Sequence, residues 1–273
     1  MAYFVRSEAL RGTGSNIGIA AALAVSILTL APSPANAQAD DSSAVLKRMT
    51  DYIAAHPDLS SQFDIEFDVI TPDIEKIQFA ASGTMTRNAP NRVRLTRHGG
   101  YSDVELIFDG KTTTIVDRYR NKYAQLTGPT SIDQLVGKLR GDYMMDLPAA
   151  DLFLTRSYDE LMNCVSVAKH VGIGVIDGQE CDHLAFRDED TDWQLWIRTG
   201  DRPLPCKYKI TSKTVAAAPD YTIRFYNWSE AKAPDSAFAF RPAAGAQAVA
   251  FDKLSDVGEL PSPVPYAKQG KPR

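Results

Sequence analysis

The sequence predicts an α+β fold dominated by antiparallel sheet. Most of the chain after residue 57 alternates apolar and polar side chains, as in Phe63–Val69, which is typical of a strand with one dry and one wet face. Two dipeptides, Asp109-Gly110 and Asp177-Gly178, are strong hairpin signals and favour antiparallel neighbours. Few segments show helical spacing instead. We therefore expect about ten strands and about three helices.

The first element after residue 40 is expected to be a helix. Asp41, Ser42 or Ser43 can cap its start, and His56-Pro57 ends it. Its apolar residues recur at i, i+4, i+7 and i+8 and form one stripe: Val45, Met49, Tyr52 and Ile53.

A β-meander is expected to follow this helix. The apolar and polar alternation predicts strands over residues 63–69, 77–87, 92–98, 104–108, 112–116 and 122–126. The turn signals between them include Asn88-Ala89-Pro90-Asn91 and Asp109-Gly110.

Two helices interrupt the strands. Ser131 and Gln134 form a capping box, and the helix that they begin places its apolar residues on one face: Ile132, Leu135, Val136, Leu139 and Tyr143. Pro148 suits the first turn of a second helix, which offers Leu152, Phe153 and Leu161 for packing. We expect these two helices to cover one face or mouth of the sheet.

Strands resume after the second helix. They are expected over residues 170–176, 180–187, 192–198, 204–212 and 221–228. The tail 253–273 is rich in proline, glycine and charge, and this composition predicts disorder.

The N-terminus has the features of an export signal. Arg6 and Arg11 precede an uncharged apolar stretch over 17–31, and Ala35-Asn36-Ala37 then offers the small-x-small pattern that signal peptidase accepts. We expect residues 1–37 to be a signal peptide cleaved after Ala37, and residues 38–252 to be the folded domain. The alternative is an uncleaved anchor, although the stretch is shorter than the roughly 20 apolar residues that a spanning helix needs. Gln38 follows the cleavage point, so the cysteine that lipidation requires is missing.

The charge of the chain argues against two classes of partner. The whole chain has a formal charge of −4, and the predicted signal peptide carries a net +1, so the mature chain carries −5. This mild acidity without a basic run gives no electrostatic footprint for nucleic acid. It also provides no polybasic patch for an anionic membrane surface.

The chain has three cysteines, Cys164, Cys181 and Cys206. In an oxidising compartment they allow one disulfide and one free thiol, or three buried thiols. Cys164 and Cys181 flank a predicted hairpin and are the pair that we expect first.

Two runs of the sequence match known functional motifs only in part. The glycine-rich run 172–178 lies within a hairpin, whereas a dinucleotide loop follows a strand and opens a helix. The acidic run 188–192 lacks the glycine and glutamate of a calcium loop, because Trp193 and Thr199 stand there. We interpret the first run as bulge and turn, and the second as an exposed acidic turn.

Cys181-Asp182-His183 places a thiol and an imidazole on one side of a strand. A zinc site needs three or four ligands, and His56, His98 and His170 are scattered through the sequence. We favour a structural histidine over a metal ligand. The sequence therefore predicts no metal site, no cofactor and no catalytic residue.

The largest feature of the predicted sheet is its apolar face. Wide curved sheets often enclose a cavity, and the alternative is an ordinary packed core. The candidates for lining such a cavity are Phe63, Ile65, Phe67, Leu106, Phe108, Leu184, Phe186, Trp193, Leu195, Ile223 and Phe225, with Phe79 and Ile210 on the same face.

Several short motifs of the sequence resemble those of one family. The most specific is the run 192–197, DWQLWI, and the others are the runs 108–111, 123–124, 147–152, 182–187, 202–205 and 238–242. Together they resemble the family of predicted periplasmic proteins called domain of unknown function 2092, over roughly residues 40–250. Pro242-Ala243-Ala244-Gly245 departs from the Pro-Pro-Gly of many relatives, which affects only the closing turn.

The resemblance implies a LolA/LolB-like fold, in which helices plug the apolar concave face of an unclosed, half-pipe β-barrel. Members of that superfamily carry lipoproteins or lipids across the periplasm, and one relative senses envelope stress. The resemblance transfers the fold and the periplasmic location, but no ligand-binding residue.

Three functions follow as hypotheses. The first is a soluble periplasmic carrier of a hydrophobic ligand, such as a lipid, an acyl chain or a lipoprotein anchor. The second is an interaction or stress-sensing module that docks an envelope protein. The third is an envelope enzyme, which requires His183 to lie in a cleft beside an acid or a thiol.

Overall fold

The computed structural model describes residues 35–254. Residues 1–34 of the predicted signal peptide and residues 255–273 of the predicted tail lie outside this part of the chain. Within the described part, no helix is long and apolar enough to cross a membrane.

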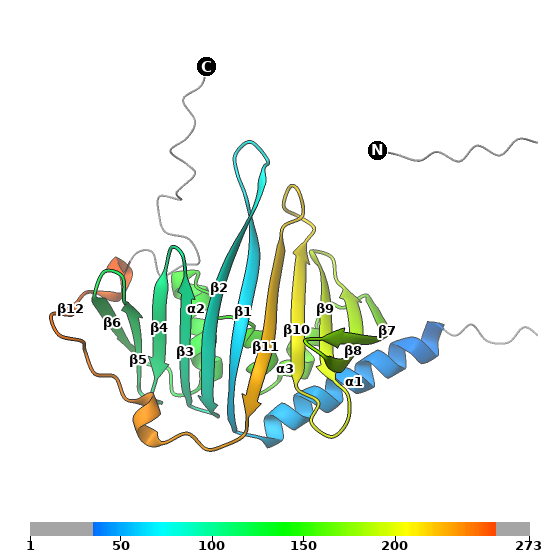
Figure 1. Cartoon of the computed structure of the whole chain (residues 1–273), viewed down its shortest axis with the longest axis horizontal. Helices are drawn as coiled ribbons and strands as arrows, with labels where there is room; N and C mark the ends of the chain where they lie inside the picture. Colours follow the sequence, from blue (N-terminus) through cyan, green and yellow to red (C-terminus); the bar gives the residue numbers. More distant parts are fainter. Residues whose placement is uncertain (1–34, 255–273) are drawn as a thin grey trace, which may run out of the picture. The chain divides into compact units, whose positions relative to one another are not determined.

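Twelve strands of the described chain form one sheet, in the order β12-β6-β5-β4-β3-β2-β1-β11-β10-β9-β8-β7 (Figure 1). Neighbours pair antiparallel, except β12, which runs parallel to β6. The strands β7 and β12 end the order, so the sheet does not close. The bounds are β1 Asp58–Ile70, β2 Lys76–Asn88, β3 Arg92–Gly99, β4 Asp103–Phe108, β5 Thr112–Asp117, β6 Lys122–Thr127, β7 Val167–Ile176, β8 Gln179–Arg187, β9 Thr191–Arg198, β10 Pro205–Ser212, β11 Asp220–Ser229 and β12 Gln247–Ala248.

Three α-helices and three short 3₁₀ turns accompany the sheet in the described chain. They are α1 Ala35–Ala55, α2 Ile132–Tyr143, η1 Ala150–Phe153, α3 Ser157–Met162, η2 Asp235–Phe238 and η3 Phe251–Lys253. The α+β class, the antiparallel sheet and its unclosed form are confirmed. Ser131 caps α2 as predicted, since its side chain accepts from the N–H of Gln134 at 3.2 Å.

Three predicted boundaries differ from the structure. Helix α1 begins at Ala35, so it includes the three residues of the predicted cleavage pattern. Strand β1 begins five residues before Phe63, because Leu59 and Ser61 continue its buried row. At the other end, Lys253 belongs to η3 and Leu254 is buried, so the first two residues of the predicted tail are part of the fold.

The second predicted helix is broken into two pieces. Leu154 has extended backbone (φ −69°, ψ 156°), which ends η1 and separates it from α3. Its successor Thr155 donates its backbone N–H to the carboxylate of Asp133 at 3.1 Å, which draws the chain towards α2. Pro148 does not start a helix, because Ala149 after it is left-handed with φ 49°.

The alternation of the strands places one row of side chains on a shared inward face. Ile65 pairs with Ile223 of β11 and with Ala81 of β2, and the row continues through Tyr208 and Leu195 into β10 and β9. The apolar stripes of α1, α2, η1 and α3 bury against this row in one core. Figure 1 shows α2 and α3 behind the sheet. The expectation that the helices cover one face is confirmed.

The inward row also holds a charged residue, Arg87 of β2, whose side chain is 4% exposed. Its guanidinium donates to the carbonyls of Ile53 at 2.8 Å and His56 at 2.9 Å, at the C-terminal end of α1. A third bond reaches the carbonyl of Phe153 in η1 at 3.3 Å. Helix ends leave carbonyls without partners, so Arg87 satisfies one end of α1 and joins it to η1. Burial lowers the pKa of Arg87 to about 10.

After β11 the chain crosses back over the opposite, outward face of the sheet. We call residues 230–246 the strap, which is orange in Figure 1 and leads to β12 beside β6. Arg92 of β3 bonds Asp235 at 2.7 Å, and Asn121 donates to the carbonyl of Ala244 at 3.1 Å. The strap is therefore held over β3–β6.

The disulfide joins Cys181 and Cys206, with a Cα–Cα distance of 7.0 Å, and Cys164 is a free, exposed thiol. The predicted pair Cys164–Cys181 was wrong. Val167 at the start of β7 pairs with Arg187, so Cys164 lies beyond that end of the hairpin. Cys181 lies six residues along β8 from Arg187, a separation of about 20 Å at a strand rise of about 3.3 Å per residue. This is far outside disulfide reach.

Candidate functional site

All eleven predicted lining residues lie in one continuous buried core. Their exposed fractions run from 0% for Phe108 to 8% for Phe67. The structure therefore brings them together, and the helices and their own neighbours cover them. Contact between these residues and a ligand stays a prediction.

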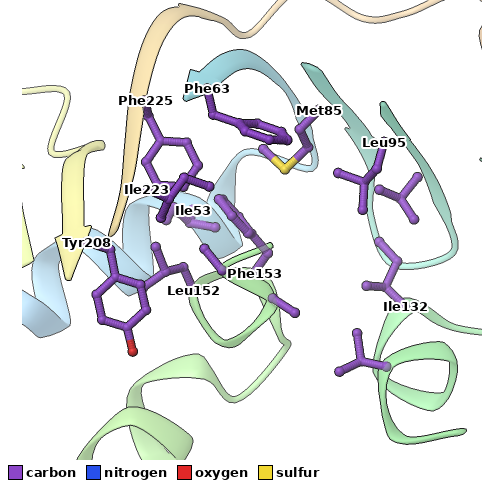
Figure 2. Close-up of a cluster of buried hydrophobic side chains, with 14 of the residues drawn as sticks. Ile53, Phe63, Met85, Leu95, Ile132, Leu152, Phe153, Tyr208, Ile223 and Phe225 are labelled. Carbon is purple, nitrogen blue, oxygen red and sulfur yellow. The ribbon is translucent and has the colours of Figure 1, made fainter. Parts of the chain in front are cut away.

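Figure 2 shows how the helices fill the centre of the inward face. Phe63 and Phe225 extend from β1 and β11 towards Phe153 and Leu152 of η1, and Ile53 of α1 lies between them. Phe225 makes edge contacts with Phe63 at 6.4 Å and with Phe153 at 6.1 Å between ring centroids. This part of the face is an ordinary packed core.

A cavity of about 590 Å³ lies where this packing ends. The sheet forms one wall, and the segment that leads from α2 to η1 forms the other. The lining residues are Arg97, Tyr208, Ile210 and Tyr221 from the sheet, Leu254 after η3, and Arg140, Tyr143, Met144, Met145, Asp146, Leu147, Pro148, Ala149 and Asp151 from α2 to η1.

A smaller space of about 40 Å³ lies beside the cavity. Arg97, Met145 and Leu147 line both spaces, and Leu95, Leu106 and Ile115 line the smaller one. Leu106 is thus the one predicted lining residue that borders either of these two spaces. The two spaces follow the inward face from β10 to β5.

The segment from Met144 to Ala149 has an unusual backbone. Met144 caps the end of α2 in the left-handed conformation (φ 51°), where glycine is the common choice, and its side chain is 92% exposed. Arg140 of α2 bonds Asp146 within the segment at 2.6 Å and Asp151 just after it at 2.8 Å, which ties the segment to α2. The flexible, exposed side chain of Met144 thus lies at the rim of the cavity.

Tyr208 supplies a polar group to the cavity wall. Its hydroxyl points away from the packed cluster in Figure 2, and its ring is 4% exposed. Burial and then the charge of Asp151 raise the pKa of Tyr208 well above its ordinary value, so the phenol stays protonated at any physiological pH. It can both donate and accept a hydrogen bond.

His183 lies on the outward face, away from the cavity. Its ring stacks on Trp196 at 4.2 Å between centroids, and its Nε2 contacts the amide oxygen of Gln194 at 2.9 Å. The enzyme hypothesis required an acid or a thiol beside His183. The sulfur of Cys181, two residues away on β8, is oxidised in the disulfide and is therefore not a free thiol. Within the described chain, no group of three or more His, Cys, Asp or Glu residues is placed to hold a metal ion.

The two other runs have the structures that the sequence indicates. Gly172 lies at a bulge in β7 with φ 135°, and Gly178 lies in the following turn with φ 79°. The acidic run forms the turn between β8 and β9, where Asp188 accepts the backbone N–H of Asp190 at 2.8 Å and of Thr191 at 2.6 Å.

The cavity residues were largely missed from the sequence, although Ile210 was placed on the correct face. Arg97 falls at every second position after Val93 and Leu95, so the alternation of β3 was sufficient to place it inward. The segment 143–149 carried no signal, because its shape depends on left-handed backbone and on the ion pairs of Arg140.

The sequence model of one family, described as a predicted periplasmic protein and called domain of unknown function 2092, matches residues 42–252. The chain belongs to this family. The family predicted from the sequence is therefore confirmed. Among curated proteins, no sequence matches significantly.

Solved structures similar to this chain share little sequence with it. LprF from Mycobacterium bovis is 11% identical, with a TM-score of 0.44, over 70% of this chain and 94% of that one. MucB in the Pseudomonas aeruginosa MucA/MucB complex is 17% identical, with a TM-score of 0.41, over 77% of this chain and 63% of that one. A LolA superfamily protein from Nitrosomonas europaea is 8% identical, with a TM-score of 0.33, over 73% and 97%.

Proposed function

We propose that this protein binds a hydrophobic ligand with a polar end, such as a lipid or an acyl chain, and carries it through the periplasm. The observation that supports the proposal is the cavity of about 590 Å³ beside the packed core. Its size is within the range of small-molecule sites, about 300–1,000 Å³. The periplasmic location agrees with the family description, and we propose that the chain reaches it after cleavage following Ala37.

The lining of the cavity suits an amphipathic ligand. Ile210, Met145 and Leu147 offer apolar surface, and burial of each methylene group contributes about 0.8 kcal/mol. Arg97 and the Tyr208 hydroxyl offer donors for a carboxylate, phosphate or ester group. The ligand chain would extend along the smaller space towards Leu106, the predicted lining residue that borders it.

A second candidate function, docking of an envelope protein, is favoured by the edge strand β7. Its exposed fractions are 55% for Val171, 58% for Ile173 and 65% for Val175. An exposed apolar edge is a template on which a partner can add a strand.

One pair of variants separates the two functions. Ile210→Glu places a charge in the cavity, and Val171→Glu makes the same kind of change on β7. If the carrier function is correct, Ile210→Glu lowers the affinity for a fluorescent fatty-acid probe at least about tenfold. Val171→Glu then binds the probe like the wild type.

The same experiment includes native cargo. The wild-type protein is purified from its exporting host and its extract is analysed by mass spectrometry, with Ile210→Glu as the matched sample. The carrier function is refuted if the wild type yields no lipid and takes up no probe. Equal uptake by wild type and Ile210→Glu would show that the probe binds outside this cavity.

A further inference from the structure

A second pocket, of about 560 Å³, lies on the opposite face of the sheet. The strap covers it, and the outward residues of β3–β6 form its floor. The lining residues are Arg94, Glu105, Ile107, Val116, Arg118, Asn121 and Tyr123 from the β3–β6 region, and Ser236, Ala239, Phe240, Arg241, Ala243 and Ala246 from the strap.

Charged side chains make up part of the lining of this pocket. Glu105 has a side chain only 5% exposed, and its two carboxylate oxygens each accept from a different arginine. Arg94 Nε donates to Oε1 at 2.5 Å, and Arg118 donates to Oε2 at 2.5 Å. Each guanidinium has five N–H donors, so both arginines keep donors beyond those bound to Glu105. The buried glutamate therefore fixes two cations side by side.

Arg241 adds a third cation from the strap. Its side chain is exposed, and it makes no ion pair with the residues that the structure describes. The lining thus holds three arginines against one glutamate, and Asp103, 4.0 Å from Arg118, offsets part of this charge. The pocket lining therefore carries a net positive charge, although the formal charge of the whole chain is −4.

Apolar and aromatic side chains make up much of the remaining lining. The rings of Tyr123 and Phe240 lie 4.9 Å apart between centroids, tilted by 51°. Val116 pairs with Tyr123 on one side and with Glu105 on the other, and Ile107 pairs with Arg94, so the apolar side chains lie directly beside the charged ones. A planar or compact apolar group can pack here while an attached anion reaches the arginines.

We propose that this outer pocket binds a small organic anion, a carboxylate, sulfonate or phosphate monoester carried on an apolar body. A volume of about 560 Å³ is typical of small-molecule sites. The pocket is separate from the inner cavity, because the sheet lies between them and no lining residue is shared.

The arginines also have a structural use, which the test must separate from binding. Arg94 donates to the carbonyl of Ala237 at 2.9 Å and so holds the strap. Arg241 has no such bond among the described residues, so Arg241→Ala removes a ligand contact without loosening the strap. Arg156, paired with Asp159 in an exposed position far from the pocket, provides the matched control Arg156→Ala.

The test measures binding of 2-naphthoate and 2-naphthyl phosphate to the mature chain by calorimetry, with the uncharged 2-naphthylmethanol beside them. The anions are expected to bind saturably in the millimolar range or tighter, and the alcohol at least about tenfold more weakly. Arg241→Ala is expected to lose at least about tenfold in anion affinity, and Arg156→Ala to bind like the wild type. Glu105→Gln, which removes the one negative charge of the lining, is expected to bind the anions more tightly.

Three results would overturn the proposal. They are the absence of saturable binding of either anion, unchanged affinity in Arg241→Ala, and loss of naphthoate binding in Ile210→Glu, which would place the anion in the inner cavity. If Glu105→Gln does not fold, the comparison of Arg241→Ala with Arg156→Ala decides the matter alone.

Discussion

Gly83 lies on the inward face of β2, directly opposite Phe63 of β1. A Cβ at this position would lie 2.4 Å from the ring of Phe63 and 2.1 Å from the carbonyl oxygen of Thr96. The absence of a side chain is thus what lets the ring of Phe63 lie against the backbone of β2 at Gly83. A glycine in a strand often marks such a close approach.

We expect Gly83→Ala to lower the free energy of unfolding by about 2 kcal/mol or more, because both contacts must be relieved by moving backbone or core. Gly137 is the matched control. It lies exposed within α2, and a Cβ there meets nothing within 4 Å, so Gly137→Ala should raise the free energy of unfolding by about 1 kcal/mol. Urea unfolding of both variants measures the difference. A neutral Gly83→Ala would mean that Phe63 is not packed as the structure has it.

At the scale of elements, Arg87 of β2 ties the C-terminal end of helix α1 to β2 and η1. Arg87→Met keeps most of the volume of the side chain but removes the donor of the His56 and Phe153 carbonyls and leaves the Ile53 carbonyl only the N–H of His56, at 3.4 Å. We expect a loss of about 3 kcal/mol, because buried acceptors without partners are costly. Urea unfolding and amide hydrogen exchange in α1 check this, with Arg156→Met as the control. Equal exchange of α1 in both variants would contradict it.

The elements show where the sequence was informative. The strands from β2 to β6 and from β8 to β11 were predicted to within about two residues, because alternation and Asp-Gly turns are local properties. The broken helix after Pro148 depends on Asp133 and the disulfide depends on the order of β8–β10, so neither is visible in a local window. The alternation of apolar and polar residues predicted which side chains face inward. Whether an inward residue lines the cavity or packs against other side chains depends on how α2 and η1 pack on the sheet.

At the scale of the whole molecule, ionised carboxylates connect parts that are distant in sequence. Glu230 accepts from Tyr52 at 2.7 Å and pairs with Arg202 at 2.9 Å, which joins α1 to the chain after β11. Hydrogen bonding from Tyr52, with the nearby Arg202, lowers the pKa of Glu230. Hydrogen bonding from Arg92 lowers the pKa of Asp235 in the same way, where the strap meets β3.

These shifts fix the direction of the pH dependence. A carboxylate with a lowered pKa in the folded state contributes stability above its unfolded pKa, about 4, and loses it as the pH falls through the folded value. We therefore expect the urea midpoint to change little between pH 7 and pH 5 and to fall between pH 5 and pH 3. The size of the fall is the combined contribution of all carboxylates whose pKa is lowered in the folded state. Glu230→Gln should be less stable than the wild type at pH 7 and should lose less on acidification, because one titrating group is absent. If the wild type and Glu230→Gln fall equally from pH 7 to pH 3, the link between α1 and the chain after β11 does not depend on the charge of Glu230.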